Sequence, residues 1–435
     1  MSRVLFIAYH FPPVGGAGVQ RAVKFVRYLP ELGWEPDVVT GPIGSIGDSY
    51  TTDETLVAEL PAGLAVRRLA GPEPLPATRW RRRAERWLRL PTRWSRWWID
   101  GITQAGREAP AIDVVLATMS PFESCAAAER LARHHGVPWV ADLRDPWALD
   151  EMRVYTTGVH RRLELRRMER SLRSAAAIVM NTAEAADRLR TSFPSLARKP
   201  IHAIPNGFDA ADFAGSPTRA REGPFRIVHT GYLHTEFGLR HRRKRAANRL
   251  LRGTLGEVDI LTRSHVFLLE AVERVAADEP TLAGRIEVHL AGASVPNVDE
   301  RPWVRHHRYL PHGEAVALVR SADLLFLPMH DLPPGVRTRT IPGKTYEYLA
   351  SGKPILAALP DGDARDLLAR LPGVRLCRPG DVTCMGKAIR SFVDEGAKHT
   401  GRETAASPYE RRRLAERIAE VFDLVVSEPR KPVSS

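Results

Sequence analysis

Short apolar runs alternate with amphipathic stretches along most of the 435 residues of the chain. The runs are short and nearly continuous, which is typical of strands covered on both faces of a parallel sheet. In chain order they are 4–9, 37–40, 64–69, 113–118, 137–141, 176–181, 201–205, 225–233, 286–291, 324–327, 355–359 and 374–376. Because apolar residues recur at helical spacing between them, the pattern predicts an α/β fold.

A small, polar stretch with Gly215 and Pro217 interrupts this alternation and predicts a linker at 208–224. A chain of this length is too long for one hydrophobic core. We therefore predict two Rossmann-like domains, at 1–207 and 225–407, followed by an amphipathic helix at 408–426.

The charge balance is basic, since 64 Lys and Arg against 51 Asp and Glu give a formal net charge of +13. Such an excess favours an anionic partner such as a nucleotide, a nucleic acid or an acidic membrane, although genome composition explains the arginine bias equally well. No apolar run approaches the ~18 residues of a membrane span and no targeting segment is recognised, so we expect a cytoplasmic protein. The three cysteines lack metal-ligand spacing and predict neither a disulfide framework nor a zinc site.

The stretch 341–357 has the strongest local pattern for ligand binding. A strand, a loop with Gly343 and a short helix from Lys344 follow one another, which places the helix start at the carboxyl edge of a parallel sheet. Free N–H groups at a helix start favour phosphate, and Lys344 adds a cation there. Glu347, one turn later, can accept hydrogen bonds from a vicinal diol such as a ribose. The alternative is an ordinary strand-to-helix turn with a solvated lysine and glutamate.

Two further loops follow predicted strands. Gly15 and Gly16 lie between the strand 4–9 and a helix, where glycine lets the backbone approach a phosphate or a sugar closely. The loop is not GxGxxG, which disfavours dinucleotide binding, and a plain glycine turn is the alternative.

After the strand 137–141, the residues Asp142, Arg144 and Asp145 should face the same edge of the sheet. There they would orient an acceptor hydroxyl, remove its proton or bind charge. Asp145 is the first choice for the acceptor contact, with Arg144 orienting it or binding phosphate. The alternative is a buried Arg–Asp pair that holds the loop.

Arginines and tryptophans are interleaved between 79 and 98, where Trp80, Trp87 and Trp94 lie seven residues apart. Such a stretch can lie in a lipid interface, or it can pack its indoles on the domain surface and leave arginine in water. Nucleic-acid binding by this segment lacks any recognised domain pattern.

Four motifs carry a resemblance to a known family: YHFPPVGG at 9–16, ADLRDPW at 141–147, IPNGFD at 204–209 and KTYEYLASGKP at 344–354. In this order they resemble retaining family 4 glycosyltransferases of GT-B fold, over most of the chain. The resemblance implies two Rossmann-like domains facing across a cleft, with the final helix crossing back to the first domain.

The resemblance also implies residue roles. Glu347 would hold the ribose, and Gly15 and Gly16 would line the cleft near the transferred sugar. Gly231 would let the backbone approach the diphosphate, and Arg263 is the candidate for the diphosphate-binding arginine.

This chain departs from the family pattern in three places. Arg339 stands where a second glutamate is usual, and Met119 stands where a histidine is common, which makes His10 the nearest substitute by topology. An insert of about 25 residues precedes the helix that starts near Ser264. Its basic part, 238–255, would cap the donor site, bind an anionic acceptor or remain a solvated loop.

The expected activity is that of a hexosyltransferase, which transfers a sugar from a nucleotide-diphosphate sugar, most simply a UDP-sugar, with retention and without a metal or another cofactor. Lys344, Arg263 and the helix start at Gly343 and Thr345 would meet the charge of the leaving group. The acceptor hydroxyl or amine belongs to a glycan, a lipid-linked intermediate or a small metabolite. An anionic membrane surface is the other partner considered, which would place the protein on the inner face of the membrane, and no specific nucleic-acid binding is expected.

Two alternatives remain open at this point. One is an epimerase or hydrolase of nucleotide sugars with the same fold. The other is a basic binding protein with a degenerate site.

Overall fold

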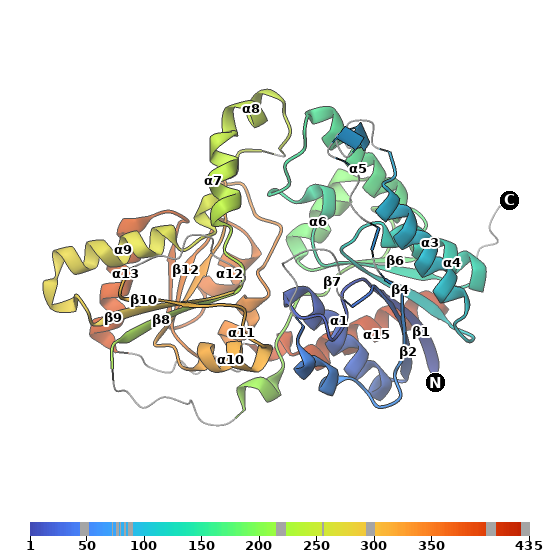
Figure 1. Ribbon diagram of the computed structural model, residues 1–435, viewed down its shortest axis with the longest axis horizontal. Helices are drawn as coiled ribbons and strands as arrows, with labels where there is room; N and C mark the ends of the chain where they lie inside the picture. The colour runs from blue at the N-terminus through green and yellow to red at the C-terminus, as the bar shows by residue number, and fades with distance from the viewer. Residues whose placement is uncertain are drawn as a thin grey trace. The chain divides into compact units, whose positions relative to one another are not determined.

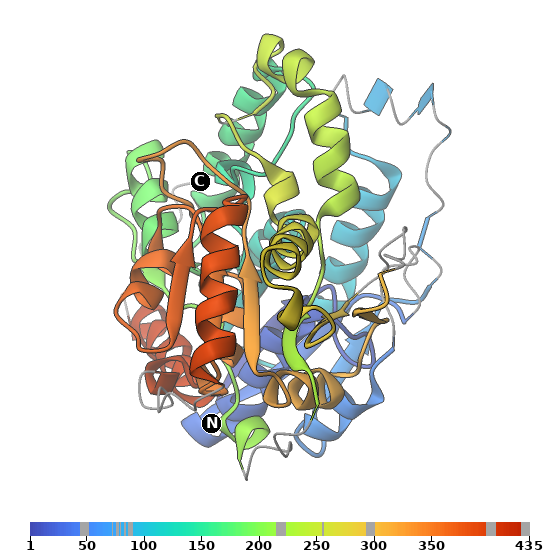
Figure 2. The same ribbon diagram turned by 90° about the vertical axis from the view of Figure 1, so that its left-hand side faces the viewer.

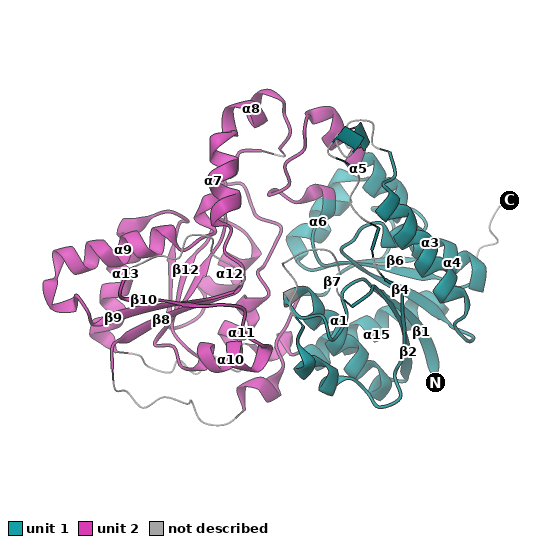
Figure 3. Cartoon of the chain, viewed as in Figure 1, with its two compact units in different colours: residues 1–147, 166–205, 411–435 teal, residues 148–165, 206–410 magenta. Residues whose placement is uncertain are grey.

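The computed structural model describes residues 1–43, 52–71, 73–74, 78, 80–81, 84–85, 90–214, 223–254, 256–292, 301–396 and 406–427. These residues form two compact α/β units (Figures 1 and 3). Unit 1 comprises 1–147, 166–205 and 411–435, and unit 2 comprises 148–165 and 206–410. Among the described helices, none combines the length and the apolar composition needed to cross a bilayer.

Unit 1 is built on a seven-stranded parallel sheet in the order β3-β2-β1-β4-β5-β6-β7. Its strands are β1 (Ser2–Ala8), β2 (Trp34–Thr40), β3 (Ala65–Arg68), β4 (Val114–Met119), β5 (Trp139–Leu143), β6 (Ala177–Met180) and β7 (Ile201–Ala203). Its helices are α1 (Ala17–Tyr28), α3 (Arg93–Arg107), α4 (Ser124–His135), α6 (Ala183–Ser192) and α15 (Arg411–Ser427), together with the C-terminal part of α5 (Gly158–Leu172). Short 3-10 turns are η1 (Leu29–Leu32) and η2 (Glu54–Glu59), and η3 (Trp147–Leu149) spans the point where the chain passes into unit 2.

Unit 2 repeats the same order in six strands, β10-β9-β8-β11-β12-β13. Its strands are β8 (Phe225–Thr230), β9 (Ile286–Ala291), β10 (Val304–His307), β11 (Leu324–Pro328), β12 (Ile355–Ala358) and β13 (Val374–Cys377). Its helices are α7 (Thr235–Arg243), α8 (Arg245–Leu250), α9 (Val266–Asp278), α10 (His312–Arg320), α11 (Lys344–Ala350), α12 (Asp363–Ala369) and α13 (Val382–Glu395). Its 3-10 turns are η4 (Ala210–Phe213), η5 (Ile260–Thr262), η6 (Pro280–Leu282) and η7 (Ser407–Tyr409).

Each sheet is covered by helices on both faces, which explains why its central strands are mostly apolar. In unit 2, α9 and α13 pack on one face through residues such as Leu268 and Ile389, while α10, α11 and α12 cover the other (Figure 1). In unit 1, the face formed by Val4, Phe6 and Val114 packs against α1 and α15.

Both sheets therefore have the strand order of the doubly wound Rossmann fold, and the predicted pair of Rossmann-like domains is confirmed. In this topology the strand order reverses between β1 and β4 in unit 1 and between β8 and β11 in unit 2. Ligands of such sheets bind outside the carboxyl ends of the strands at this reversal, so each unit has one edge where a site is expected.

The structure departs from the sequence predictions in several places. The segment 148–165, expected in the first domain, belongs to unit 2, and α5 crosses the boundary between the units. Part of the predicted linker is ordered, because η4 follows Phe208 and packs with it in the core of unit 2. The insert at 238–255 contains the helices α7 and α8.

A disulfide that the cysteine spacing did not predict joins Cys377, at the end of β13, to Cys384 in α13. The six residues between them include the turn that brings the start of α13 next to the strand end. The third cysteine, Cys125, is buried and free.

Candidate functional site

The strand reversal in unit 2 brings Gly231 and Lys344 into contact. Gly231 follows β8 with φ at 106°, a backbone conformation that favours glycine. A Cβ at this position would lie 2.7 Å from the Lys344 Nζ, so only glycine leaves room for the amine. Lys344 begins α11, which reaches the site through the long loop after β11.

His229, the next-to-last residue of β8, completes this contact. Its Nδ1 lies 3.0 Å from the Phe326 carbonyl oxygen and must donate to it, because a carbonyl oxygen only accepts. The Nε2 atom is then the acceptor for the Lys344 Nζ at 3.1 Å. Burial, followed by the charge of Lys344, lowers the pKa of His229 well below its usual value, so the imidazole is neutral.

The positive charge of Lys344 is poorly compensated. Burial, and then the nearby Arg263 guanidinium, lower the pKa of Lys344 to about 7, although the Glu347 carboxylate opposes the shift. Such a group gains most from an anion placed beside it.

Arg263 and His234 extend the same region of positive potential. Arg263 follows η5, and its Nη1 lies 3.2 Å from the Met152 Sδ, while its carbonyl oxygen accepts from the His234 backbone N–H at 3.0 Å. Burial, and then the charges of Arg263 and Lys344, lower the pKa of His234 to about 3. The Nδ1 atom of His234 is buried without a hydrogen-bond partner among the described residues. This edge of unit 2 thus presents two cations and two neutral imidazoles.

The remaining predicted donor residues lie on α11 or at its start. The backbone N–H groups of Thr345 and Tyr346 donate to the carbonyl oxygens of Pro342 and Gly343 at 3.0 and 3.2 Å. They are therefore not free to bind phosphate, and the Lys344 side chain is the main positive group of this helix start. The Thr345 Oγ1 is buried, with no hydrogen-bond partner in the described part of the chain. Glu347 is half-buried one turn along the helix.

A buried polar cluster lies beside this region, and sequence reasoning missed its centre. Glu151, from the segment 148–165, accepts hydrogen bonds from the hydroxyl of Thr338, the backbone N–H of Arg339 at 3.2 Å and the Nε2 of His330 at 3.0 Å. Arg339 also forms an ion pair with Glu151 at 3.4 Å and donates to the Leu149 carbonyl oxygen at 3.2 Å. Burial alone would raise the pKa of Glu151. The hydrogen bond from His330, the charge of His330 and the hydrogen bond from Thr338 outweigh burial and lower the pKa of Glu151 to about 2.

This cluster explains the arginine at 339 in structural terms. The Arg339 side chain is 7% exposed and paired with a carboxylate that lies 188 residues earlier in the chain. No local pattern around Glu151 indicates that it belongs to unit 2, so this pair could not be read from the sequence. His229 and His234 carry a weak signal, since they flank the glycine at the end of a predicted strand.

In unit 1 the strand reversal brings the glycine loop and Arg144 together. A Cβ at Gly18 would lie 2.7 Å from the Arg144 Nη1, which also donates to the Gly18 carbonyl oxygen. The Arg144 Nε donates to the Met119 carbonyl oxygen at 2.7 Å. Arg144 therefore joins the loops that follow β1, β4 and β5. Gly16 precedes α1 with φ at 112°, and a Cβ added there would meet no described residue within 4 Å.

The other three predicted residues of unit 1 differ in accessibility. Asp142 is fully buried and held by the Nε and Nη2 of Arg21 at 3.0 and 2.8 Å, so it has the geometry of a structural ion pair. Asp145 is exposed, and no hydrogen bond to its side chain is seen within the described ranges. His10 is half-buried, and burial together with Arg144 lowers its pKa to about 4, so it is neutral near pH 7.

The aromatic residues after the proline-rich connector have two different environments. Trp98 is buried, its ring lies 4.8 Å from that of Tyr9, and its Nε1 donates to the Ser124 Oγ at 3.1 Å. Trp94 lies 5.5 Å from Tyr9, whereas Trp80 is 78% exposed. Trp87 lies outside the described residues, so the predicted membrane contact of this segment stays a prediction.

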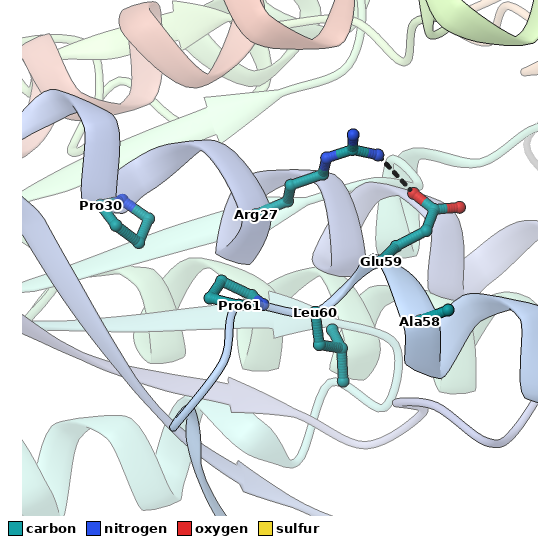
Figure 4. A pocket seen from close by; sticks show the side chains of 6 residues that line it. All are labelled: Arg27, Pro30, Ala58, Glu59, Leu60 and Pro61. Atoms are coloured by element: carbon teal, nitrogen blue, oxygen red, sulfur yellow. Dashed lines mark hydrogen bonds and ion pairs between the residues drawn. The ribbon is translucent and has the colours of Figure 1, made fainter.

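A cavity of about 490 Å³ is found elsewhere on unit 1 (Figure 4). It is lined by Arg27, Pro30, Ala58, Glu59, Leu60 and Pro61. Arg27 and Glu59 form an ion pair across it at 3.1 Å. Because its lining contains none of the residues at the two strand reversals, we do not assign the cavity to the candidate site.

Comparison with known proteins bears on the family and the fold of this chain. Residues 15–207 match the model of the glycosyl transferase 4-like domain family. Glycogen synthase from Mycobacterium tuberculosis (strain CDC 1551 / Oshkosh) is 25% identical over 236 residues, which are 54% of this chain and 50% of the relative. The chain thus aligns with half the length of that enzyme.

Solved structures match over nearly the whole chain. HepE of Anabaena, in complex with UDP and glucose, has a TM-score of 0.59 at 15% identity, covering 97% of this chain and all of HepE. The α,α-trehalose 6-phosphate synthase of Burkholderia multivorans has a TM-score of 0.57 at 13% identity, covering 98% and 99% of the two chains. The chain thus has the GT-B fold of two Rossmann-like domains, and its residues 15–207 are similar to the glycosyl transferase 4-like domain family.

Proposed function

We propose that this protein transfers a sugar from a nucleotide-diphosphate sugar to an acceptor hydroxyl or amine, with retention and without a metal ion. The glycosyl transferase 4-like domain and the GT-B fold support glycosyl transfer. Retention is supported by the resemblance of the four sequence motifs to a retaining family.

The contact between Gly231, His229 and Lys344 carries the proposal. Glycosyl transfer from such a donor releases a nucleoside diphosphate, on which negative charge develops as the glycosidic bond breaks. Lys344 and Arg263 are cations at the edge of the sheet, and the glycine at 231 allows the backbone to approach closely. In this role Lys344 and Arg263 bind the diphosphate, and Glu347 binds the ribose.

UDP is the nucleotide that we propose first, because the HepE structure that this fold matches contains UDP and glucose. On the acceptor side, Asp145 is exposed and His10 is neutral, so either can accept the proton of the acceptor hydroxyl.

The proposal is tested by measuring UDP release from UDP-sugars, with and without a panel of sugar and lipid-linked acceptors, in the presence of EDTA. We expect release that depends on an acceptor, and NMR of the product should show the anomeric configuration of the donor. Release or isomerisation without any acceptor would indicate an epimerase or a hydrolase instead. Loss of all nucleotide binding in calorimetry would indicate a degenerate site.

A matched pair of glycine variants tests the contact itself. Gly231→Ala places a Cβ against the Lys344 amine and should weaken binding of UDP about tenfold or more by calorimetry. Gly284→Ala is the control, since Gly284 also has a positive φ, at 76°, but no atom of the described residues lies within 4 Å of its Cβ position. Both variants bear the strain of alanine at positive φ, so only Gly231→Ala should lose affinity. Equal affinities would remove Gly231 from the donor site.

A further inference from the structure

The inserted helices α7 and α8 form a helical hairpin that projects from unit 2. α7 is anchored at its middle, because a Cβ at Gly238 would lie only 2.4 Å from the Leu261 Cα, and His241 is buried. α8 lies at the far end of α7, away from the sheet of unit 2 in both views (Figures 1 and 2). The residues of α8 are exposed except for the half-buried Asn248, whereas α7 is packed against η5 at Gly238.

The tip of this hairpin is held by a second segment of unit 2. The Tyr155 backbone N–H donates to the Gly253 carbonyl oxygen at 2.8 Å, and the Gly158 N–H donates to the Leu251 carbonyl oxygen at the same distance. Gly253 packs so closely on Tyr155 that a Cβ would lie 2.1 Å from its carbonyl oxygen. The tip thus has a defined position next to the start of α5.

Both segments carry exposed apolar residues close to these backbone bonds, and we call Leu250, Leu251, Val159 and Leu163 the apolar tip. They are 83%, 47%, 62% and 37% exposed, and within the described residues Leu250 is the most exposed of the large apolar side chains. Val159 directly follows Gly158, which is bonded to Leu251, and Leu163 lies one helical turn later. Single exposed apolar residues are ordinary, whereas a group of them marks an interaction surface.

Cations surround the apolar tip. The stretch 235–259 contains seven Lys and Arg against three Asp and Glu. Asp259 pairs with Arg242, and Glu257 pairs with Arg245 and Arg249. Arg243, Lys244 and Arg252 are exposed, and the described part of the chain shows no ion pair for any of them. This leaves an excess of positive charge next to exposed leucines.

We propose that the α7–α8 hairpin docks on an anionic lipid bilayer. The apolar tip enters the boundary between headgroups and acyl chains, and Arg243, Lys244 and Arg252 pair with the lipid phosphates. A nucleic acid would satisfy the cations, but it would leave the leucines in water, since strand binding uses aromatic side chains for stacking. The combination of apolar and basic side chains therefore favours a membrane surface.

Flotation of the full chain with vesicles tests the proposal. We expect binding to phosphatidylcholine vesicles that contain phosphatidylglycerol, weak binding to pure phosphatidylcholine and release by salt. Leu250→Ser with Leu251→Ser should lower the partition coefficient about tenfold, because buried apolar area sets interfacial affinity. Arg243→Gln with Lys244→Gln should lower it by a similar factor only for the anionic vesicles.

Matched controls come from exposed residues of unit 1. Leu424→Ser with Val426→Ser changes two apolar side chains that are 39% and 41% exposed, and Arg188→Gln with Arg198→Gln removes two exposed cations. Both controls should bind like the unchanged protein.

Three outcomes would overturn the proposal. One is the absence of binding to anionic vesicles by the unchanged protein. Another is binding that survives both hairpin variants but is abolished by Trp80→Ser, which would assign membrane contact to the exposed tryptophan of unit 1. The last is a hairpin that binds an oligonucleotide and no vesicle.

Discussion

At the scale of single residues, Lys344 is the group whose behaviour depends most on its surroundings. Its pKa in the folded protein is about 7, against an ordinary value of 10.5. A bound diphosphate stabilises the protonated amine of Lys344. Binding of UDP-glucose at about pH 8 should therefore be accompanied by uptake of a proton on Lys344, since the phosphates of UDP-glucose have no proton to lose near neutrality. At about pH 5.5 the amine is already charged, and no uptake is expected. Calorimetry in two buffers of different ionisation enthalpy measures this difference.

The same pKa gives the sign of two further effects. Affinity for UDP-glucose should be highest below pH 7 and fall above it, because the charge is lost. Without ligand, Lys344 loses its proton above about pH 7 in the folded chain but keeps it up to about pH 10.5 in the unfolded chain. The free energy of unfolding should therefore rise with pH between about 7 and 10.5. Lys344→Met should remove both dependences, whereas Lys387→Met, at an exposed position, should keep them. Proton uptake that persists in Lys344→Met would contradict this role.

At the scale of elements, the segment 148–165 is attached to unit 2 through the buried Glu151 and through the backbone bonds of Tyr155 and Gly158. Removing one member of a buried ion pair leaves the other without compensation, so Glu151→Gln should cost about 3 kcal/mol or more in urea denaturation. Glu151→Gln combined with Arg339→Met removes both charges and should recover part of that loss.

The same pair should make stability depend on pH. Since the pKa of Glu151 is lowered to about 2, the contribution of Glu151 to the free energy of unfolding should be complete above about pH 4.5 and fade as the pH falls toward 2. A single variant as stable as the unchanged protein would show that the segment is held by other contacts.

The elements also show what could be predicted from the sequence. Twelve apolar runs predicted twelve strands, because a strand that is covered on both faces consists mostly of apolar residues. β10 was missed, since this edge strand has the sequence VRHH with only Val304 buried. Lys344 could be named because it starts a helix after a predicted strand, whereas Gly231 and Arg263 were named through the resemblance to a known family. Glu151 and the disulfide at Cys377 could not, because they depend on contacts between distant segments or on a turn whose shape the spacing does not reveal.

At the scale of the whole molecule, the chain leaves unit 1 and returns to it with α15. Trp34 of β2 donates from its Nε1 to the Asp423 Oδ1 at 3.1 Å, and its ring lies 5.1 Å from Phe422, which is fully buried. The final helix thus completes the core formed by α1 and the sheet, and unit 1 cannot bury this face without it.

Adjacent residues of α15 allow a sharp test of that dependence. Phe422→Ala opens a cavity against Trp34 and should cost about 3–5 kcal/mol in the urea-induced unfolding of unit 1, followed by circular dichroism. Leu424→Ala, whose side chain is 39% exposed, should change stability by less than about 0.5 kcal/mol. A chain that ends at residue 410 should lose the unfolding transition of unit 1, because three segments of the chain must meet to form its core. If that shortened chain unfolds as cooperatively as the full one, α15 is an accessory to unit 1 and its core is complete without the helix.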